Sequence, residues 1–167
     1  MRQAPRFVAH VPMLATLAAL ALLGACSSPE PGRLALPPGA SVQRLDYDDA
    51  GRLNVTFRVQ NYGPKPVHYG ELALKLSLGG SEAGEFHLQL GFDIAGHNSE
   101  VVQGSVQASA AALESLKSAE QRARAIGSGT VNYHLEGTLV AEKPKGTFQL
   151  QYEGRLSPEP GLPRHFR

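Results

Sequence analysis

Apolar and polar residues alternate in several stretches along this chain. In "LNVTFRV" the alternating apolar residues are Leu53, Val55, Phe57 and Val59. In "ELALKLSL" they are Leu72, Leu74, Leu76 and Leu78. Because successive side chains of a β-strand point to opposite faces of its sheet, this period predicts strands with one buried and one solvated face.

Three further stretches, "EFHLQL", "TVNYHLEG" and "TFQLQYEG", show the same period, and "SVQRLDY" and "EVVQGSV" are weaker candidates. The expected inward residues of the three are Phe86, Leu88, Leu90, Val131, Tyr133, Leu135, Phe148, Leu150 and Tyr152. About seven such strands are typical of an immunoglobulin/fibronectin-like antiparallel β-sandwich. We therefore predict this fold.

One segment, "SAAALESLKSAEQRARAIG", has a helical period instead. Ser109 is placed to cap its start, Gly127 to end it, and Arg122 and Arg124 fall near the negative end of the helix dipole. Its apolar stripe consists of Ala112, Leu116, Ala119, Ala123 and Ile126. A stripe of mostly small residues predicts one short α-helix packed closely on an edge or end of the sandwich.

The only cysteine, Cys26, follows an apolar run near the N-terminus. Arg2 and Arg6 precede this run, which covers residues 13–23, and small residues follow it, the layout of a secretory signal. A membrane span needs about 20 apolar residues, so a retained signal-anchor helix is the less favoured alternative. A lone thiol forms no internal disulfide, which leaves Cys26 for another use.

The residues Leu23-Gly24-Ala25-Cys26 resemble the lipobox of bacterial lipoproteins. The resemblance implies that residues 1–25 are a lipoprotein signal peptide and that Cys26 becomes an acylated N-terminus inserted in the lipid bilayer. Two or more acyl chains anchor a protein stably. Ser27, where an aspartate would imply retention at the inner membrane, implies the outer membrane of a bacterial envelope, facing the periplasm.

The remaining chain divides by composition into three parts. Residues 26–40 hold the lipidated Cys26 and a tether rich in Pro and Gly, residues 41–158 the folded domain, and residues 159–167 a flexible C-terminal tail. Removing Arg2 and Arg6 from 16 basic residues leaves 14 against 15 acidic ones, a formal charge of −1. This near-neutral balance predicts no nucleic-acid partner.

No pattern in the chain predicts catalysis, a cofactor or a metal ion. Asp46, Asp48 and Gly51 match a calcium loop, but Ala50 and Phe57 occupy two of its ligand positions, so "DYDDAG" is interpreted as a hairpin turn. The histidines of the domain and tail lack metal-site spacing: His68, His87, His97, His134 and His165. His87 and His134 lie on polar strand faces, where exposure to solvent is favoured over a shared site.

The loop "QNYGPKPVHYG", residues 60–70, follows a strong strand and contains Pro64 and Pro66, which interrupt a sheet ladder. A simple strand connection is the favoured interpretation. The alternative is a binding loop that presents Tyr62, His68 and Tyr69 to a partner.

The order of these segments resembles the late embryogenesis abundant (LEA) type 2 family, also called the water stress and hypersensitive response (WHy) domain. The resemblance covers residues 41–157 and rests on "VTFRVQNYGPKPV", "YGELALKLSLGG", "VNYHLEGTLV" and "GTFQLQYEGRLS", with the helix after "EVVQGSVQAS". Tyr62 and Gly63 separate Asn61 from Pro64, whereas the family usually has Asn followed directly by Pro.

The resemblance implies a small β-sandwich with a helix and a non-catalytic role in desiccation or envelope stress. We therefore expect a membrane-anchored lipoprotein that is not an enzyme and that acts through the polar faces of its strands. The alternative is an envelope binding or assembly module that recognises one protein partner, through residues 62–69 or by strand addition at a sheet edge.

Overall fold

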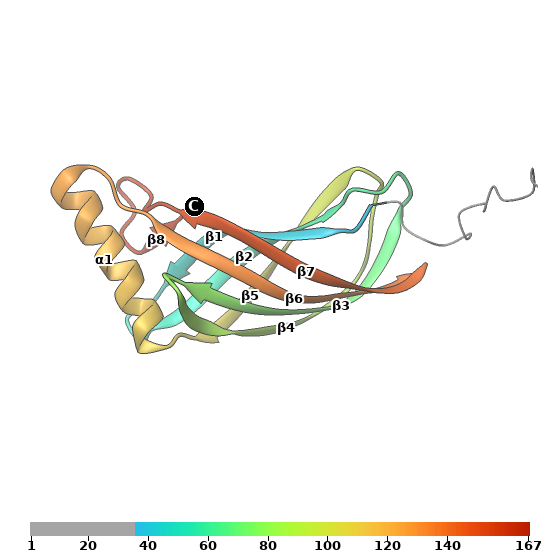
Figure 1. The fold of residues 1–167 in the computed structure, drawn as a ribbon, viewed down its shortest axis with the longest axis horizontal. Coiled ribbons are helices and arrows are strands. Elements are labelled where there is room, and N and C mark those ends of the chain that lie inside the picture. Colours follow the sequence, from blue (N-terminus) through green and yellow to red (C-terminus); the bar gives the residue numbers. More distant parts are fainter. Residues whose placement is uncertain (1–35) are drawn as a thin grey trace, which may run out of the picture. The chain divides into compact units, whose positions relative to one another are not determined.

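The computed structural model describes residues 36–167, which form eight β-strands and one α-helix (Figure 1). In chain order these are β1 (Gly39–Tyr47), β2 (Arg52–Asn61), β3 (Val67–Leu78), β4 (Ser81–Ile94), β5 (Asn98–Gln107), α1 (Ala110–Ile126), β6 (Val131–Lys143), β7 (Lys145–Leu156) and β8 (His165–Phe166).

The strands form two four-stranded sheets, in the orders β5-β2-β1-β8 and β4-β3-β6-β7, and every neighbouring pair is antiparallel. The chain crosses between the sheets after β2, β4, β5 and β7. The prediction of an antiparallel β-sandwich with one short helix is confirmed. The eighth strand, β8, is absent from the sequence prediction because its two residues carry no periodic pattern.

The core lies between the sheets and consists of the residues that the alternation places inward. Leu53, Phe57 and Val59 of β2 are completely buried, as are Leu72, Leu76 and Leu78 of β3. The rings of Phe57 and Phe86 meet edge to face at 4.9 Å between centroids and join the two sheets. Each such side chain contributes roughly 1.5–3 kcal/mol when it is removed from water.

Tyr152 departs from the predicted pattern, since it is 46% exposed although its neighbour Leu150 is buried. The ring of Tyr133 fills the space above Gly154, where a Cβ atom would lie 2.6 Å from that ring. Tyr152 stacks on Tyr133 at 5.9 Å between ring centroids. Because β7 is an edge strand, its inward face is only partly covered, and the tyrosine remains accessible.

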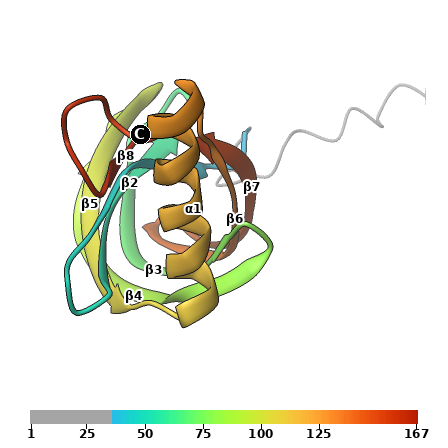
Figure 2. The ribbon, with the colours of Figure 1, turned by 90° about the vertical axis from the view of Figure 1, so that its left-hand side faces the viewer.

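The helix α1 lies across one end of the two sheets (Figure 2). Ser109 caps its start by accepting a hydrogen bond from the Ala112 amide at 3.2 Å, and Gly127 ends it with a left-handed φ of 71°. Both caps are as predicted. Ile126 is 72% exposed, so its predicted place on the buried stripe is wrong, whereas Glu120 is buried.

Residues 159–167, predicted to be a flexible tail, are ordered instead. β8 pairs with Leu45 and Asp46 of β1, and Phe166 is fully buried. The amide of Ser157 donates to the carbonyl of Arg167 at 2.8 Å. Phe166 and these backbone contacts hold the segment to the sandwich, and short-range sequence patterns predict neither.

The predicted signal peptide, Cys26 and most of the predicted tether lie outside the described residues. β1 begins at Gly39, slightly before the predicted start of the domain. Within residues 36–167, no helix combines the length and the apolar character that crossing a membrane requires.

Candidate functional site

The acidic segment between β1 and β2 forms a hairpin turn, as predicted. The amide of Gly51 donates to the Asp48 carbonyl at 3.1 Å, and the amide of Arg52 donates to the Asp48 carboxylate at 2.8 Å. The carboxylate therefore satisfies the turn's own backbone. Among the described residues, no three His, Cys, Asp or Glu side chains are arranged to hold a metal ion.

The connection between β2 and β3 is organised by Asn61, which is 1% exposed. Its Nδ2 donates to the carbonyls of Lys65, Ile94 and Ala95 at 2.8, 3.1 and 3.3 Å, and its Oδ1 accepts from the Gly63 amide at 3.0 Å. The side chain therefore ties the β2–β3 loop to the β4–β5 loop. This explains why an asparagine ends β2 before a proline-containing turn.

The three residues predicted for a binding loop do not form one surface. Tyr62 is 42% exposed and accessible to a partner. His68 is partly exposed, and its Nδ1 lies 2.7 Å from Asp93 and its Nε2 3.6 Å from Glu142. Because the two carboxylates approach opposite ring nitrogens, the three groups do not converge on one point.

Tyr69 is fully buried in the core, so its predicted role as a partner-binding residue is wrong. β3 has a register shift between Tyr69 and Glu71, and this irregularity places Tyr69 on the same buried face as Val67 and Leu72. Burial raises the pKa of its hydroxyl to about 12. The ring of Tyr69 therefore packs in the core and is not accessible to a partner at the loop surface.

The outer face of the β4-β3-β6-β7 sheet is covered by polar side chains. The strand pairing aligns His87, Ala73, Thr138 and Gln149 in one row. The next row across the four strands is Glu85, Lys75, Glu136 and Gln151. A hollow of about 490 Å³ lies in this face, with the small residues Ala73 and Gly137 in its lining, and we call it the polar hollow.

Charged groups around the polar hollow pair across strands. Lys75 Nζ lies 3.2 Å from Glu85, and this hydrogen bond raises the pKa of Lys75. His134 of β6 lies 3.5 Å from Glu153 of β7 and 3.9 Å from Glu136 of its own strand. Exposed pairs of this kind contribute little stability. The pairs keep the charged side chains near each other. Gln149 and Gln151 remain exposed, and their amide groups can both donate and accept hydrogen bonds.

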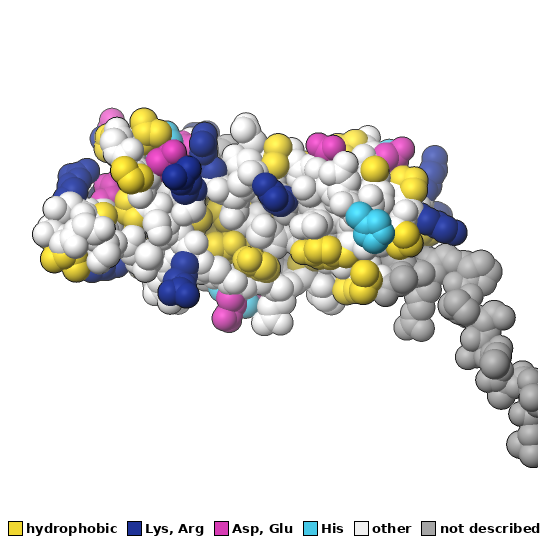
Figure 3. All heavy atoms as spheres, turned by 90° about the horizontal axis from the view of Figure 1, so that it is seen from above, with side chains coloured by type: hydrophobic (Ala, Val, Ile, Leu, Met, Phe, Trp, Pro, Cys, Tyr) yellow, Lys and Arg dark blue, Asp and Glu magenta, His cyan; other side chains and the backbone are white. Residues whose placement is uncertain are grey.

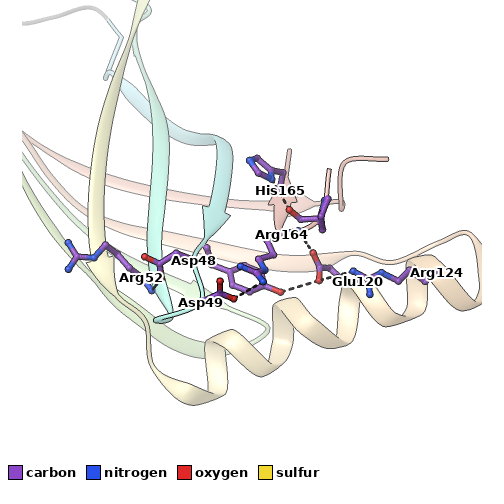
Figure 4. A network of polar contacts seen from close by, with 9 residues as sticks. Asp48, Asp49, Arg52, Glu120, Arg124, Arg164 and His165 are labelled. Atoms are coloured by element: carbon purple, nitrogen blue, oxygen red, sulfur yellow. Dashed lines mark hydrogen bonds and ion pairs between the residues drawn. The ribbon is translucent and has the colours of Figure 1, made fainter. Parts of the chain in front are cut away.

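A second polar cluster, which sequence reasoning missed, surrounds the buried Glu120 of α1 (Figure 4). Its carboxylate accepts hydrogen bonds from the Tyr47 hydroxyl at 3.1 Å and from the Arg164 amide, and Arg124 lies 3.7 Å away. Burial, followed by the hydrogen bond to Glu120, raises the pKa of Tyr47 to about 12. Glu120 lies four residues after Leu116, so the helical period placed it on the buried face.

The Glu120 cluster fixes the C-terminal segment between α1 and the β1–β2 turn. The Arg164 guanidinium lies 2.6 Å from Asp49, and its backbone adopts a φ of 68°, which is uncommon for a residue other than glycine. Contacts to its amide and to its side chain hold this conformation. The cluster consequently has a structural explanation and needs no ligand.

These features define a small antiparallel β-sandwich with a helix across one end and an outer sheet face rich in hydrogen-bonding side chains. The model of a family described as late embryogenesis abundant protein, LEA_2, matches residues 56–155. The chain belongs to this family, which is related to stress and desiccation.

The solution structure of AT1g01470 from Arabidopsis thaliana has a similar fold, with a TM-score of 0.54 at 12% sequence identity, covering 79% of this chain and 88% of that chain. A crystal structure of a protein from Archaeoglobus fulgidus gives a TM-score of 0.40 at 9% identity, covering 71% and 96%. No curated protein matches this chain. At these identities, the first likeness shows the fold alone.

Proposed function

We propose that this protein is a non-catalytic, lipid-anchored stress protein of a bacterial envelope that protects neighbouring macromolecules as water is lost. The observation that carries the proposal is the polar hollow, where amide, hydroxyl and charged side chains lie open on the outside of a rigid sheet. Membership of a stress-related family supports the same role.

The chemistry of the polar hollow suits many weak contacts. The amides of Gln149 and Gln151 and the hydroxyl of Thr138 each donate and accept hydrogen bonds. Such groups replace those that a drying surface loses with its water, and no single partner geometry is required. The Leu-rich opposite face of the sheet keeps the strands in place, so presentation of these groups costs little additional ordering.

Replacing Gln149 and Gln151 together by alanine should lower the activity that a fragile enzyme recovers after drying with the protein. The full chain and its variants are dried with the enzyme at equal mass, and activity is scored on rehydration. The matched control replaces Gln103 and Ser105, two exposed residues of β5 in the other sheet, by alanine. Equal protection by both double variants and by an unrelated β-sandwich would contradict the proposal.

Anchoring is proposed from Cys26 and the lipobox-like residues before it. We expect Cys26→Ser to abolish incorporation of labelled fatty acid and to release the protein from the membrane fraction of a bacterial host. Ser27→Asp should keep the label and move the protein from the outer to the inner membrane. Labelling that persists in Cys26→Ser would contradict acylation at this thiol.

Tyr62, which is 42% exposed, favours a second candidate function, an envelope module that recognises one protein partner. The two functions differ in whether binding to a partner saturates. A specific module would saturate and lose its partner on Tyr62→Ser, whereas general protection would tolerate this change and depend on the polar hollow.

A further inference from the structure

A groove of about 280 Å³ lies along the first half of β1, between the exposed rings of Tyr62 and Tyr152. These rings are 42% and 46% exposed, and residues 39–43 of β1 form part of its lining. We call it the tyrosine groove. Figure 3 looks onto the side of the domain where β1 and β7 lie and shows hydrophobic side chains along the middle of this face.

The two rings are held in place before any ligand arrives. Tyr62 packs over Gly39, where a Cβ atom would lie 3.0 Å from the ring. Tyr152 stacks on Tyr133, whose hydroxyl accepts a hydrogen bond from the Val42 amide at 3.3 Å. A ligand that contacts these rings therefore loses little affinity to ordering of the site.

The polar lining of the tyrosine groove favours an acidic ligand. Arg58 is exposed and, like several other arginines of residues 36–167, forms no ion pair there. The other long polar residues in the lining, Gln43 and Gln60, are neutral. No carboxylate lines the groove, so its one charge is positive.

An extended proline-containing segment suits such a groove. A polyproline helix makes no internal hydrogen bonds, so its carbonyls are free to accept from amide and guanidinium groups. Proline rings also pack on aromatic side chains in known recognition grooves.

The chain itself contains an acidic segment of this kind, and it contains the same five residues twice. The sequence Ser-Pro-Glu-Pro-Gly occurs at residues 28–32 and again at residues 157–161. In the second copy, the Glu159 carboxylate lies 3.8 Å from Arg167, so the glutamate of this sequence does pair with an arginine on this fold. The first copy lies outside the described residues and ends shortly before β1 begins.

We propose that residues 28–32 of one molecule bind in the tyrosine groove of a second molecule, with Glu30 against Arg58 and the two flanking prolines, Pro29 and Pro31, on the tyrosine rings. Pro37 and Pro38 favour an extended chain just before β1. Only six residues, 33–38, connect this segment to Gly39, where the groove begins, and two of them are prolines. Because a short connection rich in proline disfavours folding back within one molecule, we assign the groove to the segment of a neighbouring molecule.

Charge reversal tests the proposal. The full chain in detergent is studied by sedimentation velocity over a range of concentrations. Arg58→Glu and Glu30→Lys should each weaken self-association roughly tenfold, and the double variant should restore it, because an opposite-charge pair is formed again. Arg44→Glu, which reverses an exposed arginine of β1 outside the groove lining, is the matched control and should leave association unchanged.

Each other outcome overturns the proposal. Absence of concentration-dependent association, or association insensitive to both single reversals, would exclude this contact. Failure of the double variant to recover, with native circular dichroism, would show that Glu30 and Arg58 do not meet. Association lost equally in Arg44→Glu would assign the effect to net charge. If residues 28–32 bind the groove independently of protein concentration, the contact is within one molecule, and the proposed contact between two molecules is wrong.

Discussion

Replacing Asn61 by alanine should destabilise the domain by about 4 kcal/mol, because several buried backbone groups lose their partner at once and each costs roughly 1–3 kcal/mol. The amide of Gly63 and the carbonyls of Lys65 and Ile94 would be left without the side chain that now satisfies them. Urea unfolding followed by circular dichroism measures the change. A loss of this size is a large part of the roughly 5–15 kcal/mol that stabilises a typical domain.

Two variants separate the hydrogen bonds of Asn61 from its volume. Asn61→Asp keeps the shape and the acceptor for Gly63 but places a second oxygen near three carbonyls, so it should destabilise at least as much as alanine. Asn54→Ala removes an exposed asparagine with one hydrogen bond, to Asp46, and should change stability by less than about 1 kcal/mol. A nearly native Asn61→Asp would contradict this explanation.

Raising the pH from 10 to 12 should unfold the domain. Burial raises the pKa of Tyr47, Tyr69 and Tyr133 to about 12, against an ordinary value of 10.0. The folded state favours the neutral form of these hydroxyls. Their contribution to the free energy of unfolding is therefore fully present below pH 10 and is lost as the pH rises through about 12. Each contributes on the order of 2 kcal/mol, since one pKa unit corresponds to about 1.4 kcal/mol.

Circular dichroism and tyrosinate absorbance, recorded together during an alkaline titration, test this prediction. The absorbance of the buried tyrosines should rise only as the β-sheet signal is lost. Tyr69→Phe should move the unfolding transition to higher pH, because its hydroxyl has no hydrogen-bond partner to lose. Tyr133→Phe also removes the hydrogen bond to Val42, so its gain should be smaller. Complete ionisation of these tyrosines in a folded protein would contradict the assignment.

The strands and the helix could be predicted from sequence because their signals are local. The alternation of Leu53, Val55 and Phe57 selects one face of a strand whatever lies opposite. Ser109 accepts a hydrogen bond from a free amide at the start of the helix, and Gly127 ends the helix with a left-handed backbone conformation. Both effects involve only nearby residues. The family resemblance, which rests on the order of these same segments, is confirmed by the family match.

The candidate site could be predicted only in part. Tyr62 is exposed as expected for a loop residue. Tyr69 is buried, because β3 extends into the predicted loop and a register shift between Tyr69 and Glu71 turns its side chain inward. The polar residues of β6 and β7 were expected on outer faces, yet the polar hollow depends on strand register, which aligns Ala73 with Thr138. Register is a pairing between distant segments, and no single segment encodes it.

Local sequence is sufficient to predict the alternating strands, the capped helix and the family resemblance, because each depends on neighbouring residues or on their order. Three features depend instead on the packed fold: Phe166 closes the sandwich, Glu120 binds Tyr47 and the C-terminal segment, and Tyr152 stays exposed beside β1. Burial, edge position and hydrogen-bond partners arise from contacts between segments far apart in the chain, and these contacts exist only once the two sheets have packed.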